Sequence, residues 1–169
     1  QTAQAIHNAR LLEMKRRQSD ERALLLKVTQ AATSSLDLHT VLAEIAHATL
    51  GIAGVECTAV EIWHPDTDEL EIGAQSTIEE WPGVDEPGTR YPVGYWERDR
   101  EMLASRDAVR FSIDDAELDQ SSRERMIAAG SGSTLVIPLW IGDRCLGLLD
   151  LFSRAHDAFD EAAIRICTE

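Results

Sequence analysis

Helix-forming residues fill the start of the chain without interruption. No Pro or Gly occurs between Thr2 and Thr33, and Ala, Leu, Arg, Lys, Gln and Glu dominate this stretch. The pattern predicts one helix of about 30 residues. We therefore expect residues 1–34 to form a linker or signalling helix and residues 35–169 to form the domain that follows it.

One face of this predicted helix has the alternating three- and four-residue spacing of a coiled-coil seam. The seam is apolar at both ends and polar at its centre, and its residues are Leu11, Met14, Gln18, Glu21, Leu25, Val28 and Ala32. We expect the helix to pair in parallel with its copy in a homodimer. An alternative is that the apolar stripe packs only against the chain's own domain.

Beyond this helix the periodicity of apolar residues switches between helix and strand, with Gly, Pro, Ser or Asp near most changes. The predicted elements are a helix over 38–50, a hairpin over 56–74, a helix over 95–104, a strand over 109–113, a helix over 121–130, a hairpin over 133–152 and a helix over 161–169. The hairpin over 133–152 is the most apolar and is expected in the middle of the sheet. This order predicts an α+β domain in which helices flank a central antiparallel sheet of five to six strands.

Polar residues mark the ends of two predicted helices. Ser121 and Glu124 have capping-box spacing at the start of a helix that ends at Gly130. Asp160 can accept a hydrogen bond from the first turn of the last helix, which is expected to be cut short by the end of the chain.

The charge of the chain restricts its partners. The 16 Lys and Arg residues against 30 Asp and Glu give a formal net charge of −14. Because this field repels nucleic-acid backbones and anionic bilayers, we expect no nucleic-acid partner and no membrane contact. The three cysteines, Cys57, Cys145 and Cys167, form neither a disulfide framework nor a Cys/His cluster, which favours a cytoplasmic location.

No motif for catalysis is present. The sequence contains no Walker loop, nucleophile elbow, HExxH site or dinucleotide-binding fingerprint. Its five histidines are scattered along the chain, at His7, His39, His47, His64 and His156. We therefore expect no catalytic residues, no enzymatic activity and no metal site.

From Ser35 onward the chain resembles a GAF domain of a bacterial signalling protein. The segments that carry the resemblance are "SSLDLHTVLAEIAHATL", "VEIWHPDTDEL", "AVRFSIDDAELD", "STLVIPLWIGDRCLGLLDLFS" and "AFDEAAIRI". The first residues, "QAIHNARLLEMKRR", look like the end of a preceding GAF domain. The resemblance implies a sensory module that acts on a missing output domain, such as a diguanylate cyclase, histidine kinase or phosphodiesterase.

Three ligand-specific branches of the family do not fit the residues. The cyclic-nucleotide branch has an Asn-Lys and a Phe-x-x-x-Asp-Glu signature, whereas residues 159–161 join Phe, Asp and Glu directly, so that Phe159 is interpreted as a core residue. The bilin branch usually carries a Cys followed by His, and none of the three cysteines precedes a His. The haem branch needs an axial His, for which only His47 or His64 could serve. No cofactor is therefore expected.

The ligand of a GAF domain would lie beside the Pro- and Gly-rich segment over 75–94, which is expected to be a long loop. Aromatic and cationic residues gather there and just beyond it, and the candidate ligand-binding residues are Trp81, Arg90, Tyr91, Tyr95, Trp96 and Arg98. Such a set suits a planar or anionic small molecule. A cavity of roughly 300 Å³ or more with convergent polar groups would favour sensing. A cavity filled by these Trp and Tyr side chains would favour a ligand-free dimerisation and relay module.

Overall fold

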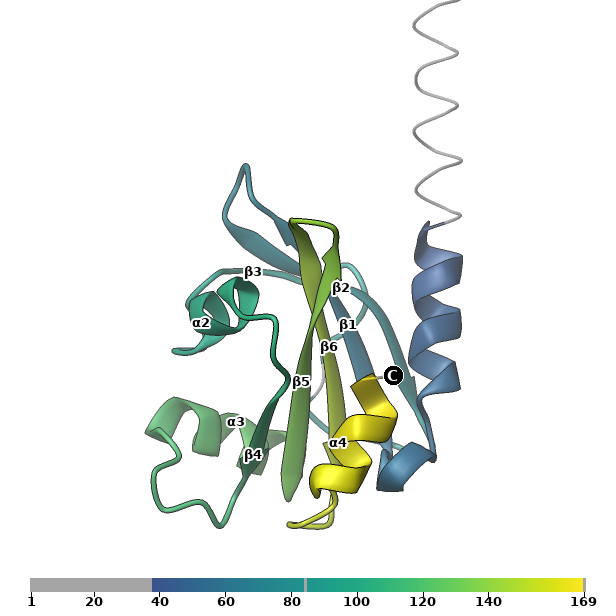
Figure 1. Ribbon diagram of the computed structural model, residues 1–169, viewed down its shortest axis with the longest axis vertical. Helices are drawn as coiled ribbons and strands as arrows, with labels where there is room; N and C mark the ends of the chain where they lie inside the picture. The colour runs from purple at the N-terminus through teal and green to yellow at the C-terminus, as the bar shows by residue number, and fades with distance from the viewer. Residues whose placement is uncertain (1–37, 84, 169) are drawn as a thin grey trace, which may run out of the picture. The chain divides into compact units, whose positions relative to one another are not determined.

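The computed structural model describes residues 38–83 and 85–168, so the predicted N-terminal helix and its seam residues lie outside the described part. The strands are β1 (Cys57–His64), β2 (Glu69–Thr77), β3 (Arg90–Pro92), β4 (Val109–Ser112), β5 (Ser133–Ile141) and β6 (Arg144–Ser153). They form one antiparallel sheet of six strands in the order β3-β2-β1-β6-β5-β4 (Figure 1). The predicted α+β class and the antiparallel sheet are confirmed.

Helices cover both faces of this sheet. The chain is helical over 38–48, and the other helices are η1 (Ile52–Gly54), α2 (Asp99–Ala104), α3 (Gln120–Ala129) and α4 (Glu161–Thr168). Figure 1 shows α2 and α3 on one side of the strands and α4 on the other. The predicted cap of the last helix is confirmed, since the backbone N–H of Ala163 donates to Asp160 Oδ1 at 2.8 Å.

Period-two alternation along β6 divides the interior into two cores. Leu148 belongs to the core that includes the side chains of α2 and α3, whereas Leu149 and Leu151 belong to the core on the opposite face. The second core also contains Phe159, which is 0% exposed, as its interpretation as a core residue requires. Among the described residues, the buried charged side chains are Glu61, Asp99 and Asp150, and they belong to the α2–α3 face.

The most apolar hairpin lies inside the sheet, as predicted. Strand β6 pairs with β1 on one side and with β5 on the other, and β4 covers the outer edge of β5. Gly147 of β6 has a φ of 154°, and a side chain there would overlap the carbonyl oxygen of Glu61 on β1. The absence of a side chain at this position therefore allows β1 to approach β6 closely.

Three details of the sequence prediction were wrong. The segment over 75–94 is not entirely a loop, since β3 within it pairs with β2. Helix α2 begins at Asp99 rather than at residue 95. The cap of α3 is Asp119, whose side chain accepts a hydrogen bond from the N–H of Ser122, and not Ser121. A three-residue strand is too short to produce a periodic signal, and Asp and Ser compete for the same capping role.

Candidate ligand site: a buried charge cluster between the sheet and α3

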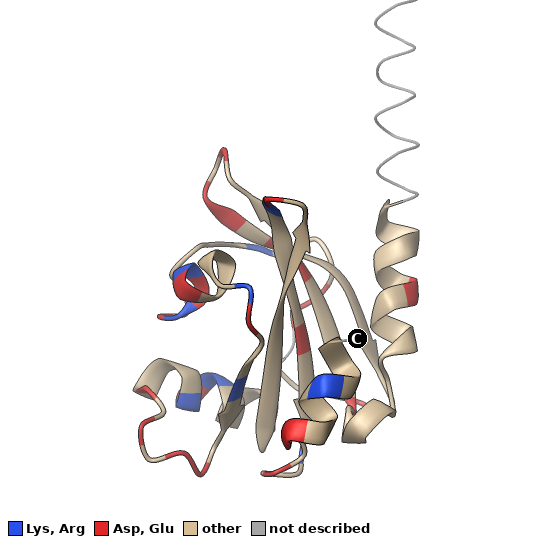
Figure 2. Cartoon of the chain, in the orientation of Figure 1, with Lys and Arg blue, Asp and Glu red and all other residues tan. Residues whose placement is uncertain are grey.

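Two acidic side chains lie on the same face of the two central strands. Glu61 on β1 is 2% exposed and Asp150 on β6 is 1% exposed. Asp150 is paired with Ala59, and Glu61 with Leu148, so the two acids are diagonal neighbours across the β1–β6 ladder. Figure 2 shows acidic positions within the central strands as well as in the loops. Burying two carboxylates side by side is unfavourable unless a cation compensates them.

Arg125 of α3 supplies that cation. Its Nη2 atom donates to Glu61 Oε1 at 3.3 Å and to Asp150 Oδ2 at 3.1 Å. Its guanidinium also lies over the ring of Trp96, 4.7 Å from the ring centre. Burial opposes the charged form, but the two acids outweigh it and raise the pKa of Arg125, so the guanidinium stays charged. These contacts hold α3 against the sheet.

A third acid approaches the cluster from α2. Asp99 is 0% exposed, and its Oδ2 atom accepts hydrogen bonds from the backbone N–H groups of Gly94 and Trp96, each at 3.3 Å. Burial, together with the negative charge of Glu61, raises the pKa of Asp99 to about 6. The carboxyl group therefore orders the turn that places Trp96 and also contributes negative charge near neutral pH.

Several polar atoms in this region make no hydrogen bond. Within the described residues, the buried side-chain atoms without a partner are Trp63 Nε1, Trp81 Nε1, Tyr91 Oη, Asp99 Oδ1 and Asp150 Oδ1. Three of these five belong to the cluster around Glu61, whose charge, after burial, also raises the pKa of Tyr91. Burial and the charge of Glu61 likewise raise the pKa of Asp150. Because buried polar groups normally have a partner, this concentration makes the region the candidate ligand site.

Two small cavities lie on either side of the Arg125–Trp96 contact. One has a volume of about 60 Å³ and is lined by Glu61 and Tyr91, among others. The other has a volume of about 30 Å³ and is lined by Arg98 and Met126, among others. Arg125 and Trp96 line both cavities. These two side chains therefore lie where the two cavities adjoin.

The structure brings together only part of the predicted ligand-binding set. Tyr91, Trp96 and Arg98 line the two cavities. Tyr95 contacts the rings of Tyr91 and Trp96 from outside and is 62% exposed. Arg90 is exposed on β3, where it pairs with Glu69 and Glu71.

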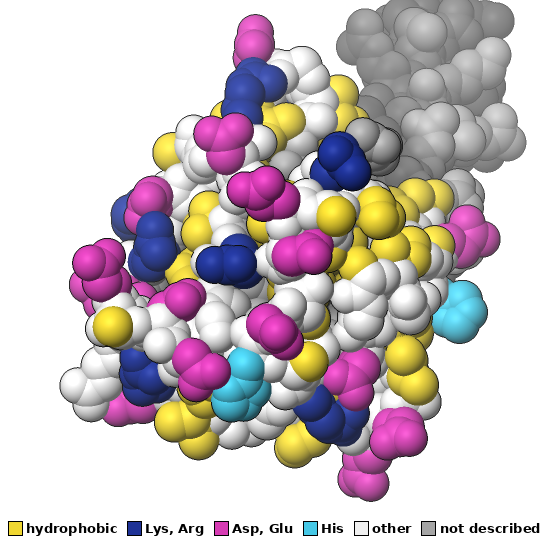
Figure 3. All heavy atoms as spheres, turned by 60° about the horizontal axis from the view of Figure 1, so that its bottom comes forward, with side chains coloured by type: hydrophobic (Ala, Val, Ile, Leu, Met, Phe, Trp, Pro, Cys, Tyr) yellow, Lys and Arg dark blue, Asp and Glu magenta, His cyan; other side chains and the backbone are white. Residues whose placement is uncertain are grey.

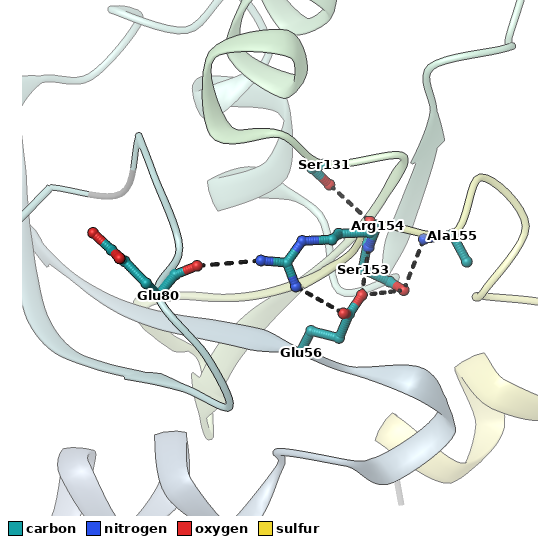
Figure 4. A network of polar contacts seen from close by, with 6 residues as sticks. All are labelled: Glu56, Glu80, Ser131, Ser153, Arg154 and Ala155. Atoms are coloured by element: carbon teal, nitrogen blue, oxygen red, sulfur yellow. Dashed lines mark hydrogen bonds and ion pairs between the residues drawn. The ribbon is translucent and has the colours of Figure 1, made fainter.

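Trp81, the sixth predicted residue, packs in a separate cluster with Cys57, Ala59 and Phe152. Arg154 covers its ring at 4.2 Å and pairs with Glu56 at 2.9 Å. Figure 4 shows how this network ties the end of β6 to the loop at residue 80, since the Arg154 guanidinium also donates to the backbone carbonyl of Glu80. Trp81 is thus held in its own cluster and lines neither cavity.

Sequence reasoning missed the four charged residues that form the centre of the site, Glu61, Asp99, Arg125 and Asp150. One signal was available: Asp150 is the only charged residue in the stretch from Cys145 to Ser153, and Glu61 lies within an apolar run of β1. An acid at an inward-facing position of a central strand requires a partner. The identity of that partner could not be deduced, because Arg125 lies far from both acids in the sequence.

A larger groove of about 640 Å³ lies elsewhere, beside α2 and the tips of the hairpins β1–β2 and β5–β6. Trp63 and Trp140 line it. Its lining residue Arg100 is already paired with Asp68 at 2.5 Å, and Trp140 Nε1 donates to the carbonyl of Ser105. We favour the interior site because the buried acids and three of the five unpartnered atoms, those of Tyr91, Asp99 and Asp150, lie there, whereas Trp63 alone of the five residues lines the groove.

Other candidate chemistry is limited in the described part of the chain. Cys57 and Cys145 are buried, Cys167 is partly buried, and burial raises the pKa of Cys57 to about 12. Within residues 38–83 and 85–168, no three His, Cys, Asp or Glu side chains are placed to hold a metal ion, and no helix is long and apolar enough to cross a membrane. Figure 3 shows acidic, basic and hydrophobic side chains intermixed on one face.

Comparison with known proteins identifies related folds. The family model described as GAF domain matches residues 37–169. The phycoerythrobilin-bound GAF domain of a cyanobacterial phytochrome has a TM-score of 0.64 and 17% identity, over 85% of this chain and 86% of that chain. The PixJ GAF domain of Thermosynechococcus elongatus in its blue-light absorbing form has a TM-score of 0.64 and 20% identity, over 80% and 82%.

The GAF domain of a two-component sensor histidine kinase from Bacillus halodurans is also similar, with a TM-score of 0.55 and 13% identity over 73% of this chain and 80% of that chain. A search of curated proteins finds no match. At these identities the solved structures show the shared fold and nothing further about this chain.

The raised pKa of Asp99 predicts how stability depends on pH. In the unfolded chain the carboxyl group ionises near pH 4, whereas in the folded chain it keeps its proton up to about pH 6. Stability from this group is therefore present below pH 4 and lost as the pH rises through 6. Asp99→Asn, which cannot ionise, should gain about 2–3 kcal/mol relative to the wild type between pH 4 and pH 7. Urea unfolding at a series of pH values measures this gain.

Glu56→Gln is the matched control for this measurement. Although partial burial opposes the shift, hydrogen bonds and the charge of Arg154 lower the pKa of Glu56, so this variant should lose stability relative to the wild type as the pH rises. Parallel curves for the wild type and Asp99→Asn would contradict the assigned environment of Asp99.

Proposed function

Because the chain belongs to the GAF domain family, we propose that it is a non-enzymatic sensory domain that binds a small molecule between the sheet and α3. In this proposal, binding moves α3 and α2, and the signal passes to an output domain such as a diguanylate cyclase, histidine kinase or phosphodiesterase. Similar folds occur in a cyanobacterial phytochrome and in a sensor histidine kinase, which supports a role in signalling.

One observation carries the proposal. The buried atoms Tyr91 Oη, Asp99 Oδ1 and Asp150 Oδ1 have no hydrogen-bond partner, and all three of these residues interact electrostatically with one guanidinium, that of Arg125. A closed core would be expected to satisfy or exclude these groups, because each unmade hydrogen bond costs about 1–3 kcal/mol. A ligand that satisfies them would recover this free energy on binding.

The present cavity volumes restrict how a ligand could enter. Neither interior cavity reaches the roughly 300 Å³ typical of ligand sites. Arg125 and Trp96 occupy the remaining space, so a ligand has to displace at least one of them. The Arg125 side chain is 24% exposed on the surface of α3 and therefore has a route to solvent. Displacement of Arg125 also breaks the contacts that hold α3 to the sheet, which couples binding to a structural change.

The chromophore of the similar phytochrome domain is not part of the proposal. Cys57 and Cys145 are buried within strands, and Cys167 is in α4 on the opposite face of the sheet. None of the three lines either interior cavity. We therefore propose a ligand held without a covalent bond.

Tryptophan fluorescence provides the test. A chemically mixed library of small molecules, with cationic, anionic and neutral members, is screened for compounds that raise the thermal midpoint of the wild-type chain. A hit should also change the fluorescence of Trp96, so Trp96→Phe should lose most of the fluorescence change. Trp140→Phe, which alters a tryptophan in the outer groove, should keep it. If no compound of any class shifts the midpoint at millimolar concentration, or if the change persists in Trp96→Phe, sensing at this site is wrong.

A second candidate function is a ligand-free dimerisation and relay module. The filled interior is one reason to consider it. A second is that the apolar side chains of Val41, Ile45 and Ile166 are 50%, 37% and 57% exposed. Exposed apolar residues on helices are often buried by a partner. In this candidate the helices carry the signal and the charge cluster has only a structural role.

Sedimentation velocity tests the relay candidate through the predicted seam in residues 1–34. Replacing Gln18 and Glu21 with Leu should tighten a dimer, because apolar residues at core seam positions favour pairing. Replacing Leu25 and Val28 with Glu should weaken it at least tenfold, because charges would be buried against their copies. Monomeric masses for both variants and the wild type, well above micromolar concentration, would contradict dimerisation through this helix.

A further inference from the structure

We propose that the ligand of this site is a small organic cation with N–H donors, of the guanidinium or primary-ammonium kind, which takes the place of the Arg125 side chain between Glu61 and Asp150. This inference rests on the proposed function and specifies its ligand class. In the ligand-free state the side chain of Arg125, which belongs to α3, occupies the position that the ligand would take.

The balance of buried charge selects a cation. Glu61 and Asp150 are almost fully buried and share one cation, Arg125, and a third buried acid, Asp99, lies on α2. A ligand that displaces Arg125 has to replace its positive charge, because an anionic or neutral apolar ligand would leave Glu61 and Asp150 without a counter-charge. A cation meets this requirement.

The hydrogen-bonding groups select a molecule that donates. Asp99 Oδ1 and Asp150 Oδ1 are carboxylate oxygens, which accept hydrogen bonds when ionised, and neither has a donor. A planar guanidinium or an ammonium group offers several N–H donors to such oxygens at once. A quaternary ammonium ion, which has none, would compensate the charge but leave both oxygens unsatisfied.

Arg125 satisfies the two acids poorly. Both of its ion pairs use one nitrogen, Nη2, at 3.3 Å and 3.1 Å. Charge-assisted N–H···O bonds are usually about 2.7–2.9 Å long, and guanidinium–carboxylate pairs are frequently bidentate. A free cation is not attached to α3 and can adopt the shorter, bidentate geometry.

Trp96 supports the same class of ligand. Its ring already lies against a guanidinium, that of Arg125, and an aromatic face attracts a cation of similar shape. The arginines that were expected to bind an anion are engaged elsewhere, since Arg90 pairs with Glu71 and Arg98 pairs with Glu101. The sequence favoured a planar or an anionic ligand, and an anionic one would have no unpaired arginine among these predicted residues.

Chemical rescue of Arg125→Ala tests the proposal. The variant leaves the acids without their cation, so its thermal midpoint at pH 8 should fall below that of the wild type. Methylguanidinium chloride at millimolar concentration should raise the midpoint of the variant saturably. Potassium chloride at the same ionic strength and tetramethylammonium chloride should not. The wild-type chain should need at least tenfold more methylguanidinium, because Arg125 competes for the same position.

Arg154→Ala is the matched control. Arg154 also stacks on a tryptophan and pairs with a carboxylate, but its partner Glu56 has a side chain that is 31% exposed. Water can solvate that carboxylate, so methylguanidinium should produce no saturable rescue. Adding Glu61→Gln and Asp150→Asn to Arg125→Ala should abolish the rescue, since it removes the acids that bind the cation. If Arg125→Ala does not fold alone, the native fraction recovered on refolding with each additive is compared instead.

The outcomes separate the ligand class from the existence of a ligand. Rescue by methylguanidinium that depends on Glu61 and Asp150 supports the proposal. No rescue, equal rescue by tetramethylammonium, or rescue that survives Glu61→Gln with Asp150→Asn overturns it. If the library screen finds only anionic or neutral compounds that depend on Trp96, sensing stands and the cation class is wrong. If neither the wild type nor Arg125→Ala binds any compound, both proposals fail.

Discussion

The need to neutralise Glu61 and Asp150 within the sheet determines the arrangement of its α2–α3 face. Both acids lie on central strands where backbone pairing leaves little freedom to move them. Another element therefore has to supply the cation, and α3 does so through Arg125, which places α3 against the sheet. Trp96 then lies over the guanidinium, and the turn that holds Trp96 is fixed by Asp99. The position of two helices thus follows from one set of charges.

The core on the opposite face of the sheet is built from apolar side chains. There Leu149 and Leu151 pack with Leu42, Ala46 and Phe159 in an apolar core. Replacing a buried ion pair by apolar residues is often neutral or stabilising, so stability alone does not explain why the α3 face keeps its acids. The proposed binding role would account for the acids, because a complementary ligand would stabilise groups that are costly to bury without it.

The sequence predicted the fold much better than it predicted the site. Strand periodicity and the apolar density of residues 133–152 were sufficient to place the central hairpin, and Asp160 marked a helix start correctly. The same periodicity places Asp150 at an inward position, but it does not tell which residue compensates it. Arg125 is 25 residues from Asp150 and 64 from Glu61, and no local spacing rule connects residues at such distances. Aromatic residues were a partial guide, since Tyr91 and Trp96 line the cavities while Trp81 packs beside Arg154.

If the charge cluster organises this face of the domain, Arg125 and Asp150 must interact strongly. A double-mutant cycle with Arg125→Met and Asp150→Asn, followed by urea unfolding at pH 8, measures this interaction. We expect a coupling free energy of about 2 kcal/mol or more, because each single change leaves a buried charge less well compensated. The more exposed pair Arg154 and Glu56, studied in the same way, should give about 1 kcal/mol or less. A coupling between Arg125 and Asp150 within about 0.5 kcal/mol of zero would show that the two charges do not organise this face.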